Sequence, residues 1–370
     1  MKESPDFETL FAKFRKDVAA VSVEETFPRL TILGSSSATP TKFRNMSGYF
    51  VELSDDFCFF VDCGEGTYGQ LLALFGPQRT AELLIKLKFI FLSHGHQDHV
   101  IGIFDLVLER RKAFLAAEKT FTPLRVLAPT IVFPTMNMYD MSIEKMTDYF
   151  EATLTTRPRT QEETAGDLWD KDGVIDVGSY IPGFESWPVK QLRVVTVHHP
   201  RQAKALILET TDGKKLVFSG DTKPCNRLIA AGKDADLLVH EATFCDEFTR
   251  DAEKKSHSTM SQAVEVGEKM NAKMTLLTHF SARYKKVPLM PTYLDAKANV
   301  GIVMDNMVVR WSELPLIPRL IPLFRAIYSN EIDDVKTQLS KRNFKKMNSL
   351  VPNADPEQSP KIAKKAQRLV

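Results

Sequence analysis

The sequence lacks the long apolar runs and the leader that membrane and secreted proteins need. No run approaches the ~18 apolar residues of a membrane-spanning helix, and the N-terminus, MKESPDFETLFAKFRK, is charged and amphipathic, unlike a secretory signal. Hydrophobic residues make up 43% of the 370 positions and charged residues 26%, which excludes disorder over most of the chain. We therefore expect an intracellular protein that is not secreted and has no membrane partner.

Cysteine is also scarce. The four cysteines, Cys58, Cys63, Cys225 and Cys245, form no CxxC pair, and a chain of this length does not need disulfide bonds to hold a core. We expect four reduced thiols.

The chain has almost no net charge, because 49 Lys and Arg oppose 47 Asp and Glu. From Lys341 onward there are eight basic and two acidic residues, so residues 1–340 carry a net charge of −4. An acidic body is not typical of a nucleic-acid-binding protein, so a polyanionic partner needs local basic patches. The Pro-punctuated end, 344–370, is predicted to be a disordered basic tail, either a solubilising segment or an arm for RNA or nuclear import.

The eight histidines gather in five short clusters, SHGHQDH, VHHP, HEAT, SHST and LTHF. Short apolar runs lead into four of these and into Asp221: KFIFLS, LRVVTV, KKLVFSG, ADLLV and KMTLLT. Such runs are typical of strands covered on both faces. Helix-like segments lie between them, at 224–231 and at 258–270, where Ser258 and Thr259 are cap candidates. The pattern predicts an α/β layered sandwich whose strands deliver His and Asp to one rim.

The SHGHQDH cluster is the strongest candidate site. A single His at a strand end is more often a satisfied polar residue, which is our interpretation of His199 and His240 taken alone. Three imidazoles and a carboxylate within six residues are instead the donor set that Zn²⁺ prefers. We expect two adjacent metal sites, with these donors: His94, His96 and His198 for one metal, Asp98, His99 and His279 for the other, and Asp221 able to bridge. Two metals about 3.5–4 Å apart can activate a bridging hydroxide, which suggests hydrolysis rather than redox chemistry.

These motifs resemble the metallo-β-lactamase-fold pattern, a fold that serves many hydrolases and does not fix the substrate. The segments LGSSSATPTKFRNMSGYFVEL and FFVDCGEGTYGQL are similar to the start of tRNase Z, and Pro40, Lys42, Arg44 and Asn45 match its PxKxRN loop. SGDTKPC, LLVHEATF, SHSTMSQA and HFSARYKKVP match its later motifs. The resemblance is greatest to the C-terminal catalytic half of the long eukaryotic form.

This resemblance implies an αβ/βα sandwich with two Zn²⁺ ions at the sheet rim, held by the donors given above. It implies that His257, aided by Glu241, donates the proton to the leaving 3′ oxygen, and that Asp98 accepts a hydrogen bond from the attacking water. A carboxylate beside an imidazole keeps it protonated near neutral pH. It also places Lys42, Arg44 and Asn45 near the tRNA acceptor end, while Arg283 is a second phosphate candidate.

Two features depart from the family pattern. In VHHP the family has one ligand His; the alignment favours His198, and His199 stays open. Only 22 residues separate His198 from Asp221, which leaves room for a strand hairpin but not for the flexible arm that grips the tRNA elbow. Long forms carry that arm on an N-terminal half, so an arm-bearing N-terminal half or second subunit is an expected partner.

We accordingly expect an N-terminal extension (1–26), a catalytic domain (27–343) and a tail (344–370). The expected function is a zinc-dependent endoribonuclease that removes the 3′ trailer from precursor tRNA in the nucleus, the mitochondrion or both, leaving a 3′ hydroxyl. The alternatives are another binuclear-zinc phosphodiesterase or hydrolase of this fold and a non-catalytic RNA-binding or interaction subunit.

Overall fold

The computed structural model describes residues 6–21, 26–156, 173–200, 202–284 and 286–349. The chain divides into two compact units, Met1–Ile327 and Tyr328–Val370. The described part of the second unit, residues 328–349, contains one helix, α10 (Ser329–Ser349). The tail predicted to be disordered, 344–370, begins within this helix, so residues 344–349 are helical instead, and the remainder lies outside the described residues.

The strands of the first unit form two sheets of seven within the described residues, plus one short pair. The first sheet, in the order β16–β1–β3–β4–β5–β6–β7, comprises Val308–Arg310, Arg29–Gly34, Gly48–Ser54, Phe57–Cys63, Leu87–Phe91, Leu124–Ala128 and Phe150–Leu154. The second, in the order β15–β13–β12–β11–β10–β9–β8, comprises Val300–Ile302, Met274–Thr278, Leu237–Glu241, Lys215–Phe218, Lys204–Thr210, Val189–Thr196 and Val174–Asp176. The parallel pair β14–β2 comprises Phe280–Ser281 and Ser36–Ser37.

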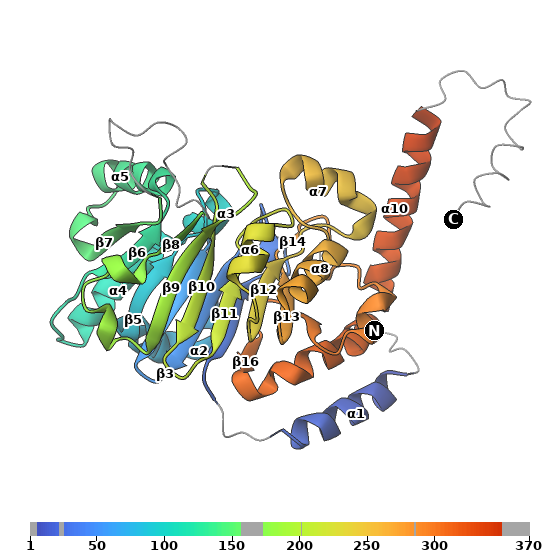
Figure 1. Cartoon of the computed structure of the whole chain (residues 1–370), viewed down its shortest axis with the longest axis horizontal. Coiled ribbons are helices and arrows are strands. Elements are labelled where there is room, and N and C mark those ends of the chain that lie inside the picture. The colour runs from blue at the N-terminus through green and yellow to red at the C-terminus, as the bar shows by residue number, and fades with distance from the viewer. Residues whose placement is uncertain (1–5, 22–25, 157–172, 201, 285, 350–370) are drawn as a thin grey trace, which may run out of the picture. The chain divides into compact units, whose positions relative to one another are not determined.

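Helices and helical turns connect and cover these strands (Figure 1). The α-helices are α1 Phe7–Ala19, α2 Thr67–Lys86, α3 Gln97–Val100, α4 Ile103–Ala116, α5 Phe133–Ser142, α6 Asn226–Ala231, α7 Thr249–Lys255, α8 Met260–Met270 and α9 Leu320–Ile327. The 3₁₀ turns are η1 Thr130–Val132, η2 Thr147–Tyr149, η3 Gly178–Tyr180, η4 Phe184–Ser186, η5 Asp246–Phe248, η6 Thr292–Ala296 and η7 Trp311–Arg319.

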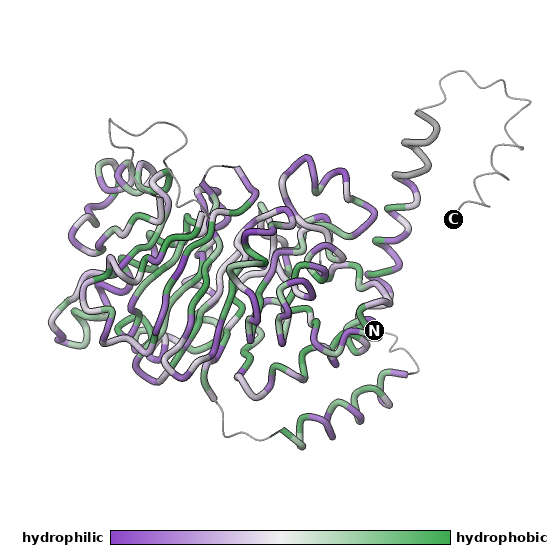
Figure 2. The backbone as a smooth tube through the Cα atoms, in the orientation of Figure 1, coloured by the Kyte–Doolittle hydropathy of each residue, from purple (hydrophilic) through white to green (hydrophobic). Residues whose placement is uncertain are grey.

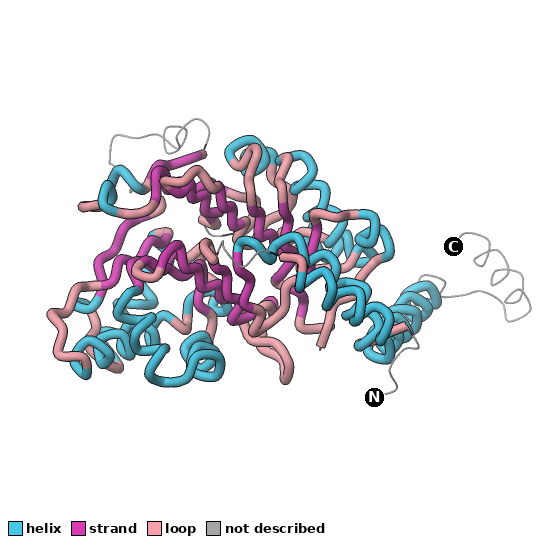
Figure 3. Tube along the Cα trace, turned by 90° about the horizontal axis from the view of Figure 1, so that it is seen from below, coloured by secondary structure: helices cyan, strands magenta, loops and turns pink. Residues whose placement is uncertain are grey.

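The two sheets pack face to face, with helices outside them (Figure 3). Strand β4 shows how the sequence produces these layers. Phe57, Phe59 and Val61 face the core between the sheets, while Cys58 and Phe60 face the core under α2 and α4. This follows because successive strand side chains point to opposite faces. Both faces are covered, so the strands read as nearly continuous hydrophobic runs (Figure 2). The predicted α/β sandwich is confirmed.

The five apolar runs singled out in the sequence are strands β5, β9, β11, β12 and β13. Strands β4 and β5 run parallel in the first sheet, and β11, β12 and β13 run parallel in the second. Parallel strands end at the same edge of a sheet, so the residues that follow them share one rim. Strands β10 and β11 form an antiparallel hairpin, which occupies the short interval before Asp221.

The first helix of the first unit packs on its last helical segments. Helix α1 lies against η7 and α9, and Asp17 of α1 forms an ion pair of 2.7 Å with Arg319. Within the described residues, no helix combines the length and the hydrophobicity needed to cross a membrane. All four cysteines are buried free thiols, as expected.

Helix α8 begins where its sequence predicts. Thr259 is the N-cap: its hydroxyl accepts a hydrogen bond from the Gln262 backbone, and the Gln262 side chain accepts one from the Thr259 backbone. The helix ends at Met270, and the capping residue after it, Asn271, adopts the left-handed conformation with φ 58°. Both ends of this helix are therefore fixed by local chemistry.

We predict that Thr259→Ala lowers the free energy of unfolding by about 1 kcal/mol, because one helix N–H loses its acceptor. Thr259→Ser keeps the hydroxyl and is expected to stay near the wild-type value. Urea unfolding of the three proteins measures the difference, and equal destabilisation by Ala and Ser would contradict the capping role.

Candidate metal centre

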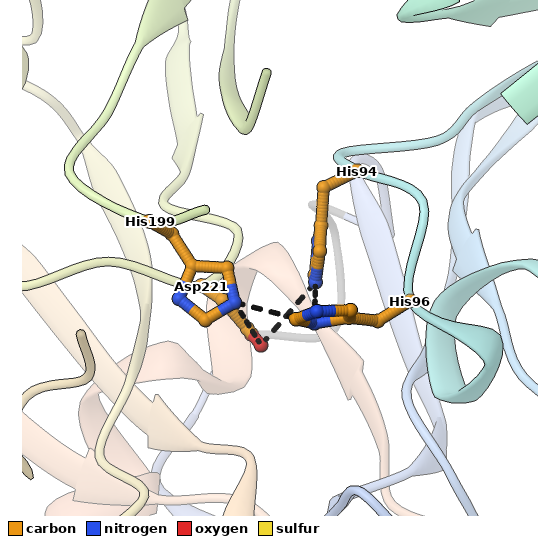
Figure 4. A group of neighbouring side chains, drawn as sticks. All are labelled: His94, His96, His199 and Asp221. Carbon is orange, nitrogen blue, oxygen red and sulfur yellow. Dashed lines mark hydrogen bonds and ion pairs between the residues drawn. The ribbon is translucent and has the colours of Figure 1, made fainter. Parts of the chain in front are cut away.

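Four donor side chains converge at the rim shared by the two sheets (Figure 4). They are His94, His96, His199 and Asp221, whose candidate ligand atoms all lie within 4.8 Å of one another. His96 Nδ1 lies 2.8 Å from His94 Nε2 and 3.3 Å from His199 Nε2. Asp221 Oδ2 lies 3.6 Å from His94 Nε2 and 3.7 Å from His199 Nε2. Ring nitrogens and a carboxylate oxygen thus surround one point.

A second group, Asp98, His99 and His279, lies beside the first. Nε2 of His99 is 3.2 Å from Nε2 of His279, and Asp98 Oδ2 lies 3.5 and 3.6 Å from these two atoms. Asp221 serves this group as well, with Oδ1 3.3 Å from His279 Nε2 and Oδ2 3.4 Å from His99 Nε2. One carboxylate therefore faces both donor groups.

Hydrogen bonds to the outer ring nitrogens of His94 and His99 fix the direction of these imidazoles. The His99 Nδ1–H donates to Asp62 Oδ2 over 2.7 Å. Ser93 donates its hydroxyl to the same carboxylate over 2.8 Å, so Ser93 Oγ accepts from His94 Nδ1 over 3.0 Å. Each ring consequently directs its Nε2 inward, as metal-ligating histidines do.

The second sheet holds its histidines in the same way. His199 Nδ1–H donates to the Ser256 carbonyl over 2.8 Å. Thr243 donates its hydroxyl to Glu241 over 2.6 Å and accepts from His279 Nδ1 over 2.9 Å. Imidazole nitrogens that face inward, together with buried carboxylates, form a donor set that fits zinc.

Burial and neighbouring charges set the protonation of the cluster. His94 is fully buried; burial and the nearby His99 hold its pKa well below the usual value, so the ring is neutral. Burial disfavours the charged form of Asp221, but the imidazoles of His279 and His99 outweigh it and keep its pKa well below the ordinary value. The site thus combines the neutral imidazole of His94 with the ionised carboxylate of Asp221.

His257 pairs with Glu241 and lies beside Asp221 and His279, with which it makes a third group of possible metal donors. Its Nδ1–H donates to Glu241 Oε1 over 2.9 Å, and the backbone N–H of Thr222 donates to the same oxygen over 2.8 Å. Burial lowers the pKa of His257, but the Glu241 carboxylate outweighs this and raises it to about 9. The ring centroid lies 4.8 Å from that of His199. A protonated imidazole therefore lies next to the donor cluster.

The structure corrects the choice between the two histidines of VHHP. His199 lies in the first donor group, whereas the side chain of His198 is exposed and its backbone N–H donates to Thr222 Oγ1 over 3.0 Å. Strand β9 ends at Thr196, and the turn that follows brings the second histidine, not the first, back to the rim. The alternative left open by the sequence is the one that the geometry favours.

Arg44 also differs from its sequence interpretation as a phosphate ligand. Its side chain is 2% exposed, and its guanidinium donates to four backbone carbonyls at 2.6–3.0 Å: Ser35, Phe280, Ser281 and Tyr284. With these donors occupied and buried, Arg44 joins the 35–45 loop to the segment after His279. It clamps the loop and does not face solvent.

The other predicted substrate residues lie around this clamp. Lys42 is exposed, and the Asn45 backbone N–H donates to Asp305 over 2.5 Å. Arg283 is half-buried, stacked over the Phe248 ring at 4.2 Å and 3.5 Å from Asp251. Lys42 is the most accessible cation of the three predicted in this region.

Sequence reasoning missed several residues that build the site. Asp62, Ser93 and Thr243 orient the candidate donor histidines, and Asp305 holds both Ser35 and Asn45. The VDCGEG segment places Asp62 directly before a glycine-containing turn, and this local pattern could have marked Asp62 as a candidate site residue. Thr243 and Asp305 carry no such signal, because their partners come from distant parts of the chain.

Comparison with known proteins supports the geometry. Residues 58–280 match the model of the Beta-lactamase superfamily domain. The chain is 40% identical to the "Zinc phosphodiesterase ELAC protein 2 homolog" of Caenorhabditis elegans over 333 residues, which cover 86% of this chain and 40% of that protein. It is 32% identical to "Ribonuclease Z, mitochondrial" of Drosophila melanogaster over 351 residues, which cover 92% and 43%. The chain thus spans about two fifths of the length of these relatives.

Solved structures show the same architecture. A long form RNase Z from yeast aligns with a TM-score of 0.69 and 26% identity, covering 82% of this chain and 44% of that one. The human short-form tRNase Z aligns with a TM-score of 0.59 over 76% of this chain and 98% of that one; at 22% identity this likeness shows the fold alone. These matches confirm the resemblance and the metallo-β-lactamase fold expected from the motifs. The chain belongs to the beta-lactamase superfamily.

Proposed function

We propose that this chain is the catalytic unit of a zinc-dependent endoribonuclease that removes the 3′ trailer of precursor tRNA and leaves a 3′ hydroxyl on the tRNA. The observation that carries the proposal is the pair of donor groups sharing Asp221, with the His257–Glu241 pair alongside. The names of the relatives, zinc phosphodiesterase and ribonuclease Z, favour phosphodiester hydrolysis of RNA over the other reactions of this fold.

Two Zn²⁺ ions would be held by donors from both sheets. The first would take His94, His96 and His199, the second Asp98, His99 and His279, and Asp221 would be shared. When bound, such a pair lowers the pKa of a water molecule and neutralises charge on the phosphodiester. The protein's part is to hold the imidazoles in the correct tautomer and to keep the carboxylates ionised.

His257 is suited to give a proton to the leaving 3′ oxygen. Glu241 engages its Nδ1, so Nε2 is the nitrogen free to act as the acid. Asp98 would accept a hydrogen bond from the attacking water, and the Ala38 backbone N–H, 2.6 Å from Asp98 Oδ2, holds that carboxylate in place. General acid catalysis of this kind contributes roughly 10²–10⁴-fold.

The substrate we propose is precursor tRNA, with Lys42 and Arg283 as contacts to its phosphates. The β10–β11 hairpin fills the interval in which an arm would lie, so an arm-bearing N-terminal half or a second subunit is the proposed partner. The name of the Drosophila relative favours the mitochondrion as the compartment, while the nucleus stays a prediction from the basic tail.

The deciding experiment uses a 5′-labelled precursor tRNA with a 3′ trailer, incubated with the chain with and without a zinc chelator. One chelator-sensitive cut after the discriminator nucleotide is the expected result. Hydrolysis of bis(p-nitrophenyl) phosphate with no cut in the RNA, even after the arm-bearing half is added, would favour a phosphodiesterase acting on small substrates instead.

We predict that His199→Ala loses bound zinc and hydrolysis together, because a donor must be in place for the metal to bind. The neighbouring variant His198→Ala is the matched control and is expected to keep both. Metal content by elemental analysis, with phosphodiester hydrolysis measured in parallel, tests the pair. Loss of zinc and hydrolysis in His198→Ala but not in His199→Ala would instead identify His198 as the ligand.

His257→Ala is expected to keep its zinc and to lower kcat by roughly 10²–10⁴-fold, because the proton donor is removed while the ligand atoms remain. Zinc content and single-turnover cleavage of the RNA are the measurements. A variant that loses its metal would show that His257 is instead a ligand.

Arg44→Ala is predicted to lower the free energy of unfolding by about 3 kcal/mol, because four buried carbonyls lose their donor. Arg44→Lys keeps the charge but cannot span four acceptors, so it should also be destabilised. Denaturant unfolding checks both. If Arg44→Ala folds with wild-type stability and only the KM for RNA rises, Arg44 binds a phosphate after all.

A further inference from the structure

Phe43 is an aromatic side chain that the fold leaves 47% exposed between two cations. Lys42 Nζ lies 5.8 Å and Lys286 Nζ 5.0 Å from the centroid of its ring. An exposed hydrophobic residue alone is unremarkable. An exposed ring bordered by two lysines, on a chain whose first 340 residues are net acidic, is instead a local basic and aromatic patch.

The backbone that presents Phe43 is held rigidly. The N–H groups of Phe43 and Arg44 both donate to Thr41 Oγ1, over 3.2 and 2.9 Å, and the Thr41 N–H donates to the Arg44 carbonyl over 2.8 Å. The buried guanidinium of Arg44 also binds the Tyr284 carbonyl, two residues before Lys286. The clamp that removes Arg44 from solvent therefore sets Phe43 and Lys286 side by side, before any ligand arrives.

The patch is close to the candidate metal centre. The same loop donates the Ala38 N–H to Asp98 Oδ2 over 2.6 Å. Phe43 follows five residues later, so its Cα lies at most ~18 Å from that of Ala38 even in an extended chain, and the turn at Thr41 shortens this. A strand of a few nucleotides that enters the metal centre can reach the ring.

We propose that Phe43 is a stacking platform for one unpaired base of the RNA within a few nucleotides of the cleaved bond, and that Lys42 and Lys286 contact the phosphates on either side of that base. The inference rests on the proposed function, since it assumes an RNA substrate. Proteins bind unpaired nucleotides by stacking bases on aromatic rings while cations track the backbone. Cation–π contacts at exposed sites are weak. When a base stacks on the ring, the two lysines can therefore leave the ring and contact the neighbouring phosphates.

The test compares wild type with Phe43→Ala on precursor tRNAs that lack a single base, one position at a time on each side of the cut. Removing Phe43 is expected to weaken RNA binding roughly tenfold and to leave hydrolysis of bis(p-nitrophenyl) phosphate unchanged. Removing the stacked base should weaken binding to wild type by a similar factor and have no further effect on Phe43→Ala. Such non-additivity isolates the contact between the two groups.

Matched variants distinguish base stacking on the aromatic ring from the effect of side-chain size. Phe43→Trp keeps a π face and should bind as wild type does, whereas Phe43→Leu should resemble Phe43→Ala. Phe11→Ala removes a ring of similar exposure, 40%, from helix α1 and should change nothing. Lys42→Gln and Lys286→Gln should each reduce the slope of log Kd against log salt by about 0.7.

Binding by fluorescence anisotropy and cleavage are measured separately, so that the two proposals can fail independently. RNA cut after the discriminator, with equal affinity for wild type and Phe43→Ala, would overturn the stacking platform alone. RNA bound in a Phe43-dependent way but never cut would support the platform and overturn the proposed reaction. RNA neither bound nor cut would overturn both.

Discussion

The buried carboxylate of Asp221 is the interaction around which the site is organised. It lies within 3.7 Å of the inward nitrogens of His94, His99, His199 and His279. Burying an ionised carboxylate is costly unless it is paired and hydrogen-bonded, and here imidazoles on every side provide that pairing. Around this centre, two more carboxylates pair with imidazoles in the same way: Asp62 with His99, and Glu241 with His257. The rim therefore concentrates acidic and imidazole groups that stabilise one another and direct ring nitrogens inward.

A second constraint fixes the loop above this rim. Arg44 satisfies carbonyls from two segments that are more than 230 residues apart in sequence, and Asp305 holds the same loop through Ser35 and Asn45. Loops are in general the more variable and mobile parts of a protein. So many buried hydrogen bonds to a single loop are therefore unusual. This suggests that the position of the loop relative to Asp98 matters, and that accessible side chains such as Lys42 and Phe43 depend on it.

Much of this could be read from the sequence, for identifiable reasons. Strands buried on both faces appear as apolar runs, so β5 and β11–β13 were predictable, and so was the gathering of His and Asp where they end. Thr259 was predictable because capping is local. The choice between His198 and His199 was not, because one residue of turn geometry decides which ring faces the rim. Arg44 looked like a phosphate ligand because its acceptors are backbone carbonyls, which have no sequence signature. Thr243 and Asp305 escaped notice since their partners are distant in the chain.

The two donor groups draw on both layers of the sandwich. His94, His96, Asp98 and His99 follow β5 of the first sheet, while His199, Asp221 and His279 follow strands of the second. Ions seated among them would cross-link the layers at one end, much as a disulfide joins two segments. A ligand present at 100 times its dissociation constant adds about 2.7 kcal/mol to the stability of the state that binds it. The resistance of this fold to heat should then be set in part by the availability of metal in its surroundings.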